Sequence, residues 1–249
     1  MFDIQGPAIV TGAASGLGQA VCLALVAHGI SVTGLDRQPG PAADRLEYSL
    51  CDVTSPEQVQ QALDAAKQRW GPPRIVVNCA GIGRSARVLG RNGVHEFALF
   101  EQVIRVNLLG TFNVLRLAVE QMHQLPVMAT GDRGIVVNTA SIAAFDGQVG
   151  QAAYAASKAG VVGMTLPLAR ELGKYGIRVV TLCPGVFHTP MVDAHVSDAV
   201  LDGLLTNAAW PRRAGEPGEF ADMVLAVVRN RMLNGESIRL DGGLRMPAI

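Results

Sequence analysis

The chain has 249 residues, 49% of them hydrophobic and 17% charged, so it is long enough to bury a large core within one domain. Its 21 basic and 21 acidic residues cancel and form no long run of either sign, which argues against nucleic acid or an anionic membrane as a partner. No apolar run approaches the roughly 18 residues of a membrane span, and the N-terminus has no signal-peptide pattern, so we expect a soluble cytoplasmic protein.

Short apolar runs alternate with longer amphipathic stretches along the chain. The expected strands are 7–10, 31–36, 46–52, 74–81, 134–141, 176–185 and 235–243, and the expected helices are 19–29, 54–71, 94–124 and 151–174, the second capped by Thr54 or Ser55. Uninterrupted apolar strands separated by helices predict an α/β fold. We expect a single Rossmann-like domain over 1–249, a doubly wound parallel sheet of about seven strands with helices on both faces.

Two stretches depart from this alternation. Pro167 lies inside the expected helix 151–174, where its missing N–H predicts a kink, but the apolar pattern resumes beyond it, so we expect no helix end there. Residues 185–216 are irregular. Within them, the segment 186–214 is rich in Val, Leu, Ala and Met, which predicts a mobile substrate loop over an apolar pocket.

The cysteines form no C-x-x-C pair and have no metal-ligand spacing, and each lies in or beside an apolar run. They are Cys22, Cys51, Cys79 and Cys183. We therefore expect buried, reduced thiols and no metal site.

The stretch TGAASGLG, residues 11–18, joins the first expected strand to the first expected helix. Gly12, Gly16 and Gly18 allow a tight turn and let a phosphate approach N–H groups at a helix N-terminus. The spacing is G-x-x-x-G-x-G, not G-x-G-x-x-G, and glycines also serve as plain turn residues, so the motif alone is weak. Asp36 at the end of the second strand strengthens the prediction of a dinucleotide site.

Acidic and polar residues at the strand ends bear on the cofactor. A carboxylate at Asp36 can hydrogen-bond a ribose diol and repels a 2′-phosphate, which favours NAD over NADP. A plain turn aspartate, or a 2′-phosphate bound by the adjacent Arg37, is the alternative. Asp52 is placed to meet an adenine edge or to cap the next helix. Asn78 and Gly81 end the fourth strand at the ligand-binding edge, or simply shape its turn.

Residues 139–160 hold one tyrosine, Tyr154, and one lysine, Lys158, four residues later. At this spacing the two side chains share one face of a helix. The ammonium can then stabilise a phenolate and move the phenol pKa from about 10 towards the operating pH, as a general base requires. Taken singly, Tyr154 also suits a subunit interface and Lys158 a solvated surface.

Several short motifs follow one another along nearly the whole chain. TGAASGLG, Asp36, CDV, NCAG, RVNLLGTFNV, Ser141 followed by Tyr154 and Lys158, and CPG together resemble the short-chain dehydrogenases/reductases. Within that family, residues 138–170 and the tail LNGESIRLDGGLRM look most like the type II 3-hydroxyacyl-CoA dehydrogenases, also known as 17β-hydroxysteroid dehydrogenase type 10. The glycine turn departs mildly from the family's common form, as does Cys79 from its frequent asparagine.

The resemblance implies four catalytic residues. Tyr154 would take the substrate hydroxyl proton as hydride leaves for the nicotinamide, Lys158 would hold the nicotinamide ribose, and Ser141 would bind the substrate oxygen. Asn107 would support a water chain from Lys158 to solvent. Read alone, Ser141 is also a strand-end cap and Asn107 a helix-bending polar group. The implied cofactor contacts are Gly12, Ser15, Gly16, Leu17, Gly18, Asp36, Asp52, Val53, Asn78, Ala80, Gly81, Tyr154, Lys158, Pro184, Gly185, Val186 and Thr189.

The subfamily likeness implies NAD-dependent interconversion of an L-3-hydroxyacyl-CoA and the 3-oxoacyl-CoA. Gln148 would then donate to the thioester oxygen of this acyl-CoA substrate, or only pack its loop. Arg84, Arg87 and Arg91 form a local basic cluster that either contacts CoA phosphate or is solvated. His188 is expected to be a loop histidine without a catalytic role.

Other functions stay open. A steroid or general secondary-alcohol dehydrogenase would use the same four residues, and a 3-oxoacyl reductase of fatty-acid synthesis would prefer NADPH, against which Asp36 argues. A dinucleotide-binding regulatory subunit would lack at least one catalytic residue, and none is lacking. The resemblance implies a homotetramer, and small residues in 151–174 suit helix packing between subunits.

Overall fold

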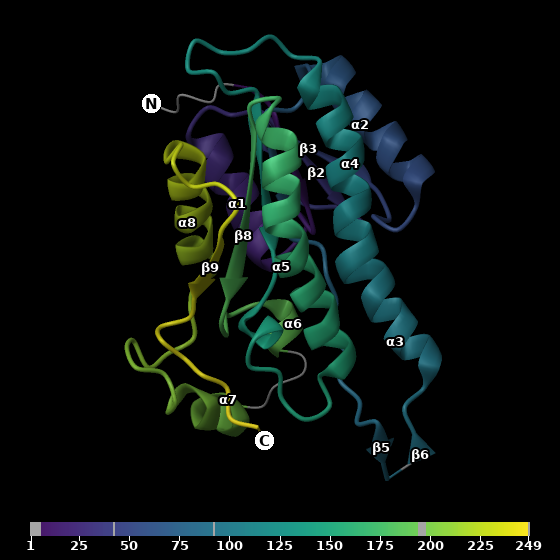
Figure 1. Ribbon diagram of the computed structural model, residues 1–249, viewed down its shortest axis with the longest axis vertical. Coiled ribbons are helices and arrows are strands. Elements are labelled where there is room, and N and C mark those ends of the chain that lie inside the picture. Colours follow the sequence, from purple (N-terminus) through teal and green to yellow (C-terminus); the bar gives the residue numbers. More distant parts are fainter. Residues whose placement is uncertain (1–5, 42, 92, 194–197, 249) are drawn as a thin grey trace.

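The computed structural model describes residues 6–41, 43–91, 93–193 and 198–248. Within these ranges a parallel seven-stranded sheet has the order β3-β2-β1-β4-β7-β8-β9, which confirms the expected Rossmann-like α/β fold. The arrowheads of β8 and β9 in Figure 1 point to its carboxyl edge, where α6 (Pro190–Asp193), α7 (Asp198–Leu205) and the hairpin of β5 (Leu89–Gly90) and β6 (Gly93–Val94) lie. The strands are β1 (Ala8–Thr11), β2 (Val32–Asp36), β3 (Leu46–Leu50), β4 (Ile75–Asn78), β7 (Gly134–Thr139), β8 (Ile177–Pro184) and β9 (Ser237–Leu240).

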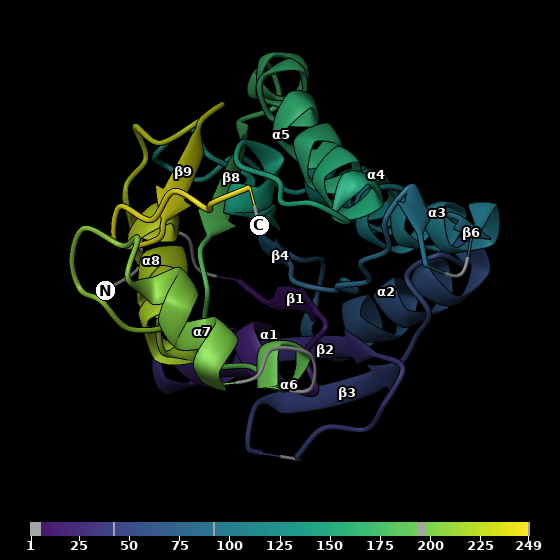
Figure 2. The same cartoon turned by 90° about the horizontal axis from the view of Figure 1, so that it is seen from below.

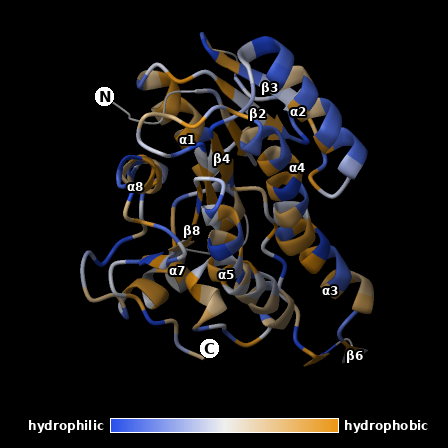
Figure 3. Cartoon of the chain, turned by 45° about the horizontal axis from the view of Figure 1, so that its top comes forward, coloured by the Kyte–Doolittle hydropathy of each residue, from blue (hydrophilic) through white to orange (hydrophobic). Residues whose placement is uncertain are grey.

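Helices cover both faces of the sheet because its central strands are apolar on both sides. Along β1, Ala8 and Val10 pack into the core under α1 and α8, while Ile9 between them packs under α2, α4 and α5. Figure 2 shows these two groups of helices on opposite sides of the strands, and Figure 3 shows the hydrophobic strands between them. The helices are α1 (Gly16–Ala27), α2 (Pro56–Trp70), α4 (Thr111–His123), α5 (Ala152–Gly173) and α8 (Pro217–Arg229).

The predictions about where two of the helices begin or end hold. Ser55, one of the two expected caps, accepts a hydrogen bond from the Gln58 N–H at 3.2 Å and begins α2. Pro167 lies inside α5, which continues to Gly173, so the proline does not end the helix. None of the helices in the described ranges combines the length and hydropathy that a bilayer crossing requires.

The prediction of one helix over 94–124 is wrong in two respects: the helix begins later, and it is interrupted. Gly93 and Val94 form β6, which pairs with β5 (Leu89–Gly90) in a short hairpin, so α3 begins only at Phe97 and runs to Ile104. A π-helical turn (Arg105–Gly110) then separates α3 from α4. Such a turn depends on side-chain contacts with other elements, which periodicity in the sequence does not reveal.

The irregular stretch 185–216 contains two short helices, α6 (Pro190–Asp193) and α7 (Asp198–Leu205). Its two ends meet, because the His188 N–H donates to the Gly215 carbonyl and the Gly215 N–H to the Val186 carbonyl, both at 2.9 Å. The segment is therefore a loop closed at its base. Helix α8, which follows, matches none of the expected elements.

The C-terminal end of α8 is held by a buried arginine from β8. Arg178 is 5% exposed, and its guanidinium donates to the carbonyls of Val227, Val228, Asn230 and Leu233 at 2.8 to 3.2 Å. Carbonyls in the last turn of a helix have no partner within the helix. Arg178 therefore joins α8 to the sheet.

We predict that Arg178→Met lowers the free energy of unfolding by about 3 kcal/mol, because it leaves several buried carbonyls without a donor. Urea denaturation followed by circular dichroism measures the change. The control is Arg170→Met on the exposed surface of α5, which we expect to change stability by less than about 0.5 kcal/mol. Equal effects of the two substitutions would contradict the assigned role of Arg178.

Candidate active site

A cavity of about 340 Å³ opens at the carboxyl edge of the sheet and is lined by residues that end or follow six of its strands. Parallel strands bring their carboxyl ends to the same edge, which is where open α/β sheets bind ligands. Three of the four expected catalytic residues line it: Ser141, Tyr154 and Lys158. The expected cofactor residues in its lining are Gly12, Ser15, Gly16, Leu17, Gly18, Asp36, Asp52, Val53, Gly81, Pro184, Gly185 and Thr189.

The glycine turn brings the backbone close to the next strand and begins α1 at the cavity. Gly12 has φ +64°, and a Cβ there would lie 2.9 Å from the backbone N of Ala80. Gly16 has φ +52°, a conformation that favours glycine, and is the first residue of α1. N–H groups in the first turn of a helix lack partners within the helix, so this end of the cavity suits a phosphate.

Asp36 ends β2 and lines the cavity beside Arg37. Its Oδ2 accepts from the Ala14 N–H and its Oδ1 from the Gln38 N–H, both at 3.0 Å. These contacts fix the carboxylate, and each oxygen keeps a second lone pair that can accept a hydroxyl. The arrangement suits a ribose diol.

Lys158 is a largely buried residue of the cavity wall. It is 5% exposed, and its Nζ donates to the Thr139 carbonyl at 2.8 Å, at the end of β7. Burial lowers the pKa of Lys158 to about 8. Burial also raises the pKa values of the neighbouring Cys79 and Cys183 thiols to about 11, so at neutral pH these are uncharged thiols. Of the four free cysteines, Cys22, Cys51 and Cys183 are buried as expected, whereas Cys79 is only half-buried.

Tyr154 lines the cavity together with Ser141 and Lys158. The Lys158 Nζ is 5.8 Å from the centroid of the Tyr154 ring. Burial raises the pKa of Tyr154, and the nearby Ser141 hydroxyl lowers it by a smaller amount. The pKa of this phenol is therefore raised and not lowered as the spacing of Tyr154 and Lys158 led us to expect, because desolvation of the phenol dominates.

Ser141 occupies the turn that follows β7. It caps a short 3₁₀ helix, Ile142–Ala144, and its Oγ accepts from the Ala143 N–H at 3.1 Å. The hydroxyl can still donate a hydrogen bond, because only its acceptor capacity is used by the backbone. The Ser141 hydroxyl can therefore cap the turn after β7 and at the same time donate a hydrogen bond into the cavity.

Asn107 is fully buried in the π-helical turn and does not line the cavity. Its Oδ1 accepts from the Ile82 N–H at 2.8 Å, and its Nδ2 donates to the Ile82 carbonyl at 3.0 Å and to the Ser157 Oγ at 3.1 Å. At Gly81, a Cβ would lie 3.2 Å from the Asn107 Oδ1 and 3.5 Å from the Lys158 Nζ. Asn107 therefore joins the loop after β4 to the wall behind Lys158.

Four other expected site residues lie outside the cavity lining. The Asn78 Nδ2 donates to the Asn138 Oδ1 at 2.9 Å inside the sheet, so this side chain is turned away from the cavity. The Gln148 amide donates to the Pro247 carbonyl at 3.1 Å, which favours the loop-packing alternative. Ala80 and Val186 are the other two.

The sequence did not single out several residues of the lining. Gln102 on α3 and Val106 in the π-helical turn both face the cavity, as do Phe187 and Met191 of the closed loop. The i,i+4 spacing of the first pair is a helical face, but only the folded chain shows that this face meets the cavity.

The basic cluster and the loop histidine lie on the surface. Arg84, Arg87 and Arg91 are exposed, the first two on the segment that leads into the hairpin β5–β6 and the third in its turn, and none lines the cavity. His188 is exposed, with its Nε2 4.0 Å from Glu216, in agreement with the expectation of a loop histidine. Within the described ranges, no group of three or more His, Cys, Asp or Glu could hold a metal ion.

The chain is similar to known proteins over nearly its whole length. The family model for short chain dehydrogenases matches residues 7–200. The chain is 45% identical over 248 residues to 3-hydroxyacyl-CoA dehydrogenase type-2 of Bos taurus, with 96% of this chain and 95% of the relative covered. It is also 45% identical over 247 residues to the enzyme of that name from Drosophila melanogaster, with 96% of each chain covered. The crystal structure of 3-hydroxyacyl-CoA dehydrogenase type-2 from Mycobacterium avium has a TM-score of 0.90 and 38% identity, covering 98% of this chain and 97% of that one.

We predict that Lys158→Met raises the melting temperature at pH 7 although it removes a polar contact. Since burial lowers the pKa from 10.5 to about 8, the folded protein holds the ammonium at a cost of about 3 kcal/mol below pH 8. This cost disappears as the pH rises through 10.5, the ordinary value, because the amine is then neutral in both states.

The measurement is differential scanning fluorimetry of wild type and variant from pH 7 to pH 10. The advantage of the variant should shrink across this range. Lys67→Met, at an exposed position of α2, is the control and should show no such pH trend. A lower melting temperature of Lys158→Met than of wild type at pH 7 would contradict the predicted cost of holding the buried ammonium.

Proposed function

The chain belongs to the short-chain dehydrogenase family of oxidoreductases, and on this premise we propose that it interconverts L-3-hydroxyacyl-CoA and 3-oxoacyl-CoA with NAD as cofactor. The observation that carries the reaction type is that Ser141, Tyr154 and Lys158 line one cavity, with the Lys158 Nζ 5.8 Å from the centroid of the Tyr154 ring. The substrate class rests on relatives that are named for it and that match nearly the whole chain.

The cavity fits a dinucleotide. The cradle has no room for a side chain at Gly12 or Gly18, and Gly16 has a positive φ; the cradle presents the first turn of α1, which suits a pyrophosphate. Asp36 would hold the adenosine ribose and Asp52 the adenine edge. The backbone of Val53 and Ala80, and the 184–189 stretch with Val186 and Thr189, would complete the shell. Bound NAD supplies the hydride acceptor.

Tyr154 is the general base of the proposed oxidation. Its phenolate takes the proton of the C3 hydroxyl, and the C3–H bond gives up its electron pair as hydride, so the carbinol becomes a ketone. Ser141 donates a hydrogen bond to the same oxygen and stabilises negative charge on it. In the reverse direction Tyr154 returns the proton.

Lys158 adjusts the pKa of Tyr154 and binds the cofactor ribose. One of its three N–H groups is used by Thr139, so two remain for ribose hydroxyls and for water. A positive charge near the phenol opposes the effect of desolvation on its pKa. Asn107, which meets Lys158 at Gly81, would support the water chain that carries the proton onward.

The closed loop and the assembly complete the proposal. The segment 186–214 would form the substrate loop of one domain spanning the chain, and its Phe187 and Met191 give the cavity an apolar wall. This wall also suits a steroid or another secondary alcohol, and oxidation of such an alcohol is the second candidate function.

Exposed apolar residues on α4 and α5, such as Phe112 and Leu166, support a homotetramer. The free thiols support a cytoplasmic location.

We predict that the purified protein oxidises NADH with acetoacetyl-CoA. Tyr154→Phe should lower kcat at least about 10³-fold, because the ring remains but the hydroxyl that transfers the proton is lost. Absorbance at 340 nm follows the reaction. Tyr175→Phe, at a tyrosine outside the cavity lining, is the control and should keep wild-type turnover.

The same assay runs as a panel of short, medium and branched acyl-CoA substrates beside steroids. Higher kcat/KM for steroids than for every thioester would replace the proposed substrate with the second candidate. Retained turnover in the Tyr154 variant would refute the proton transfer itself.

We further predict that the enzyme prefers NADH to NADPH and that Asp36→Asn shifts the ratio of kcat/KM towards NADPH by about tenfold or more, because the variant loses the charge that repels a 2′-phosphate. Steady-state kinetics with both cofactors gives the ratio. Asp64→Asn, on the exposed side of α2, should leave the ratio unchanged. A wild-type preference for NADPH would contradict the assignment of NAD.

A further inference from the structure

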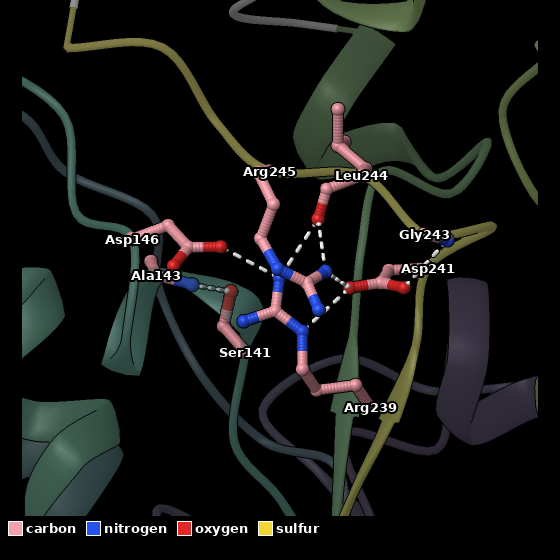
Figure 4. A network of polar contacts seen from close by, with 8 residues as sticks. All are labelled: Ser141, Ala143, Asp146, Arg239, Asp241, Gly243, Leu244 and Arg245. Carbon is pink, nitrogen blue, oxygen red and sulfur yellow. Dashed lines mark hydrogen bonds and ion pairs between the residues drawn. The ribbon is translucent and has the colours of Figure 1, made fainter. Parts of the chain in front are cut away.

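An arginine from β9 is bonded to the turn that carries Ser141. The Arg239 Nη2 donates to the Asp146 Oδ2 at 2.6 Å, and its Nε donates to the Asp241 Oδ2 at 2.7 Å. The side chains of Arg239 and Asp146 are each only 20% exposed, so water screens this pair weakly. Figure 4 shows Arg239 between the two carboxylates, with Ser141 beside Asp146.

Asp146 ends the turn that Ser141 begins. The N–H groups of Phe145 and Asp146 both donate to the Ile142 carbonyl at 2.9 Å, directly after the 3₁₀ helix that Ser141 caps. The Phe145 ring lies against the same guanidinium, with its centroid 5.4 Å from the Arg239 Cζ. A displacement of Asp146 therefore shifts Ser141, because a few backbone hydrogen bonds of the turn connect the two residues.

The C-terminal segment takes part in the same cluster. The Leu244 carbonyl accepts from the Arg239 Nη2 at 2.8 Å, and the Leu244 side chain, 1% exposed, packs with Ile142 and Ala208. The Trp210 N–H donates to the Gly242 carbonyl at 3.0 Å. The end of the loop 186–214 and the Ser141 turn thus meet at residues 239–244.

We propose that Arg239 and Asp146 form a positioning pair that holds the Ser141 hydroxyl at the Tyr154 phenol and ties this turn to the end of the substrate loop. The planar guanidinium reaches Asp146, Asp241 and Leu244 at once, which a lysine ammonium on a flexible stem does not do as well. Neither residue of the pair touches the cavity, so both act through Ser141. The inference rests on the proposed function for the roles of Ser141 and Tyr154 and for its assay substrate.

Asp146→Asn keeps the size of the side chain and removes the charge that Arg239 holds. We expect kcat to fall about tenfold, because displacement of a catalytic group by a fraction of an ångström costs rate. The Kd for NADH, measured by its fluorescence, should remain unchanged, since the pair lies outside the cofactor cavity. Asp146→Glu restores the carboxylate and should recover most of the lost kcat.

The matched control is Asp132→Asn, which breaks another Asp–Arg pair of the same 2.6 Å length, with Arg231. Asp132 precedes β7, whereas Ser141 follows it, so the control lies at the opposite end of the same strand. We expect Asp132→Asn to lower the melting temperature and leave kcat unchanged.

All variants are assayed with whichever ketone of the substrate panel the wild-type enzyme reduces best. Wild-type kcat in Asp146→Asn, an equal loss of kcat in Asp132→Asn, or no recovery in Asp146→Glu would each overturn the positioning role. Failure of the wild type on every acyl-CoA would instead count against the proposed substrate and would be seen before the variants are compared.

Discussion

A lysine ammonium buried at the carboxyl end of β7 is the constraint to which the rest of the site conforms. Lys158 reaches the Thr139 carbonyl at 2.8 Å only because α5 lies close to that strand end. Gly160, two residues further along α5, permits a close approach of the π-helical turn, since a Cβ there would lie 2.8 Å from the Leu108 side chain. Burial of the charge costs stability. It also places a cation 5.8 Å from the Tyr154 ring, where proton transfer is proposed to occur.

Around this lysine, segments far apart in the sequence hold the catalytic groups from behind. Asn107 ties the loop after β4 to α5 through Ile82 and Ser157. The pair of Arg239 and Asp146 ties the Ser141 turn to β9. These contacts are buried or half-buried and have defined partners, so they fix side chains more firmly than a solvated loop would. A proton acceptor and a hydrogen-bond donor that meet at one substrate oxygen require such fixed positions.

Much of the fold and part of the site could be predicted from the sequence. Apolar strands without polar interruptions predict a buried parallel sheet, and its carboxyl edge is a defined place for a ligand. Gly12 and Gly16 have the positive φ values that a tight turn requires, and Asp36 ends β2 as its position suggested. Tyr154 and Lys158 share a helix face because four residues make about one turn. All of these inferences depend on local spacing.

What the sequence by itself determined is the alternation of strands and helices, the glycine turn and the set of reactive side chains. Only the tertiary structure decided that desolvation raises the pKa of Tyr154, that Gln148 is used by Pro247, and that Asn107 lies in a π-helical turn. It also paired Arg239 with Asp146, 93 residues away. The physical reason is the range of the interactions. Hydrophobic periodicity and turn preferences act between near neighbours in the chain, whereas burial, charge pairing and cavity walls depend on residues that meet only after folding.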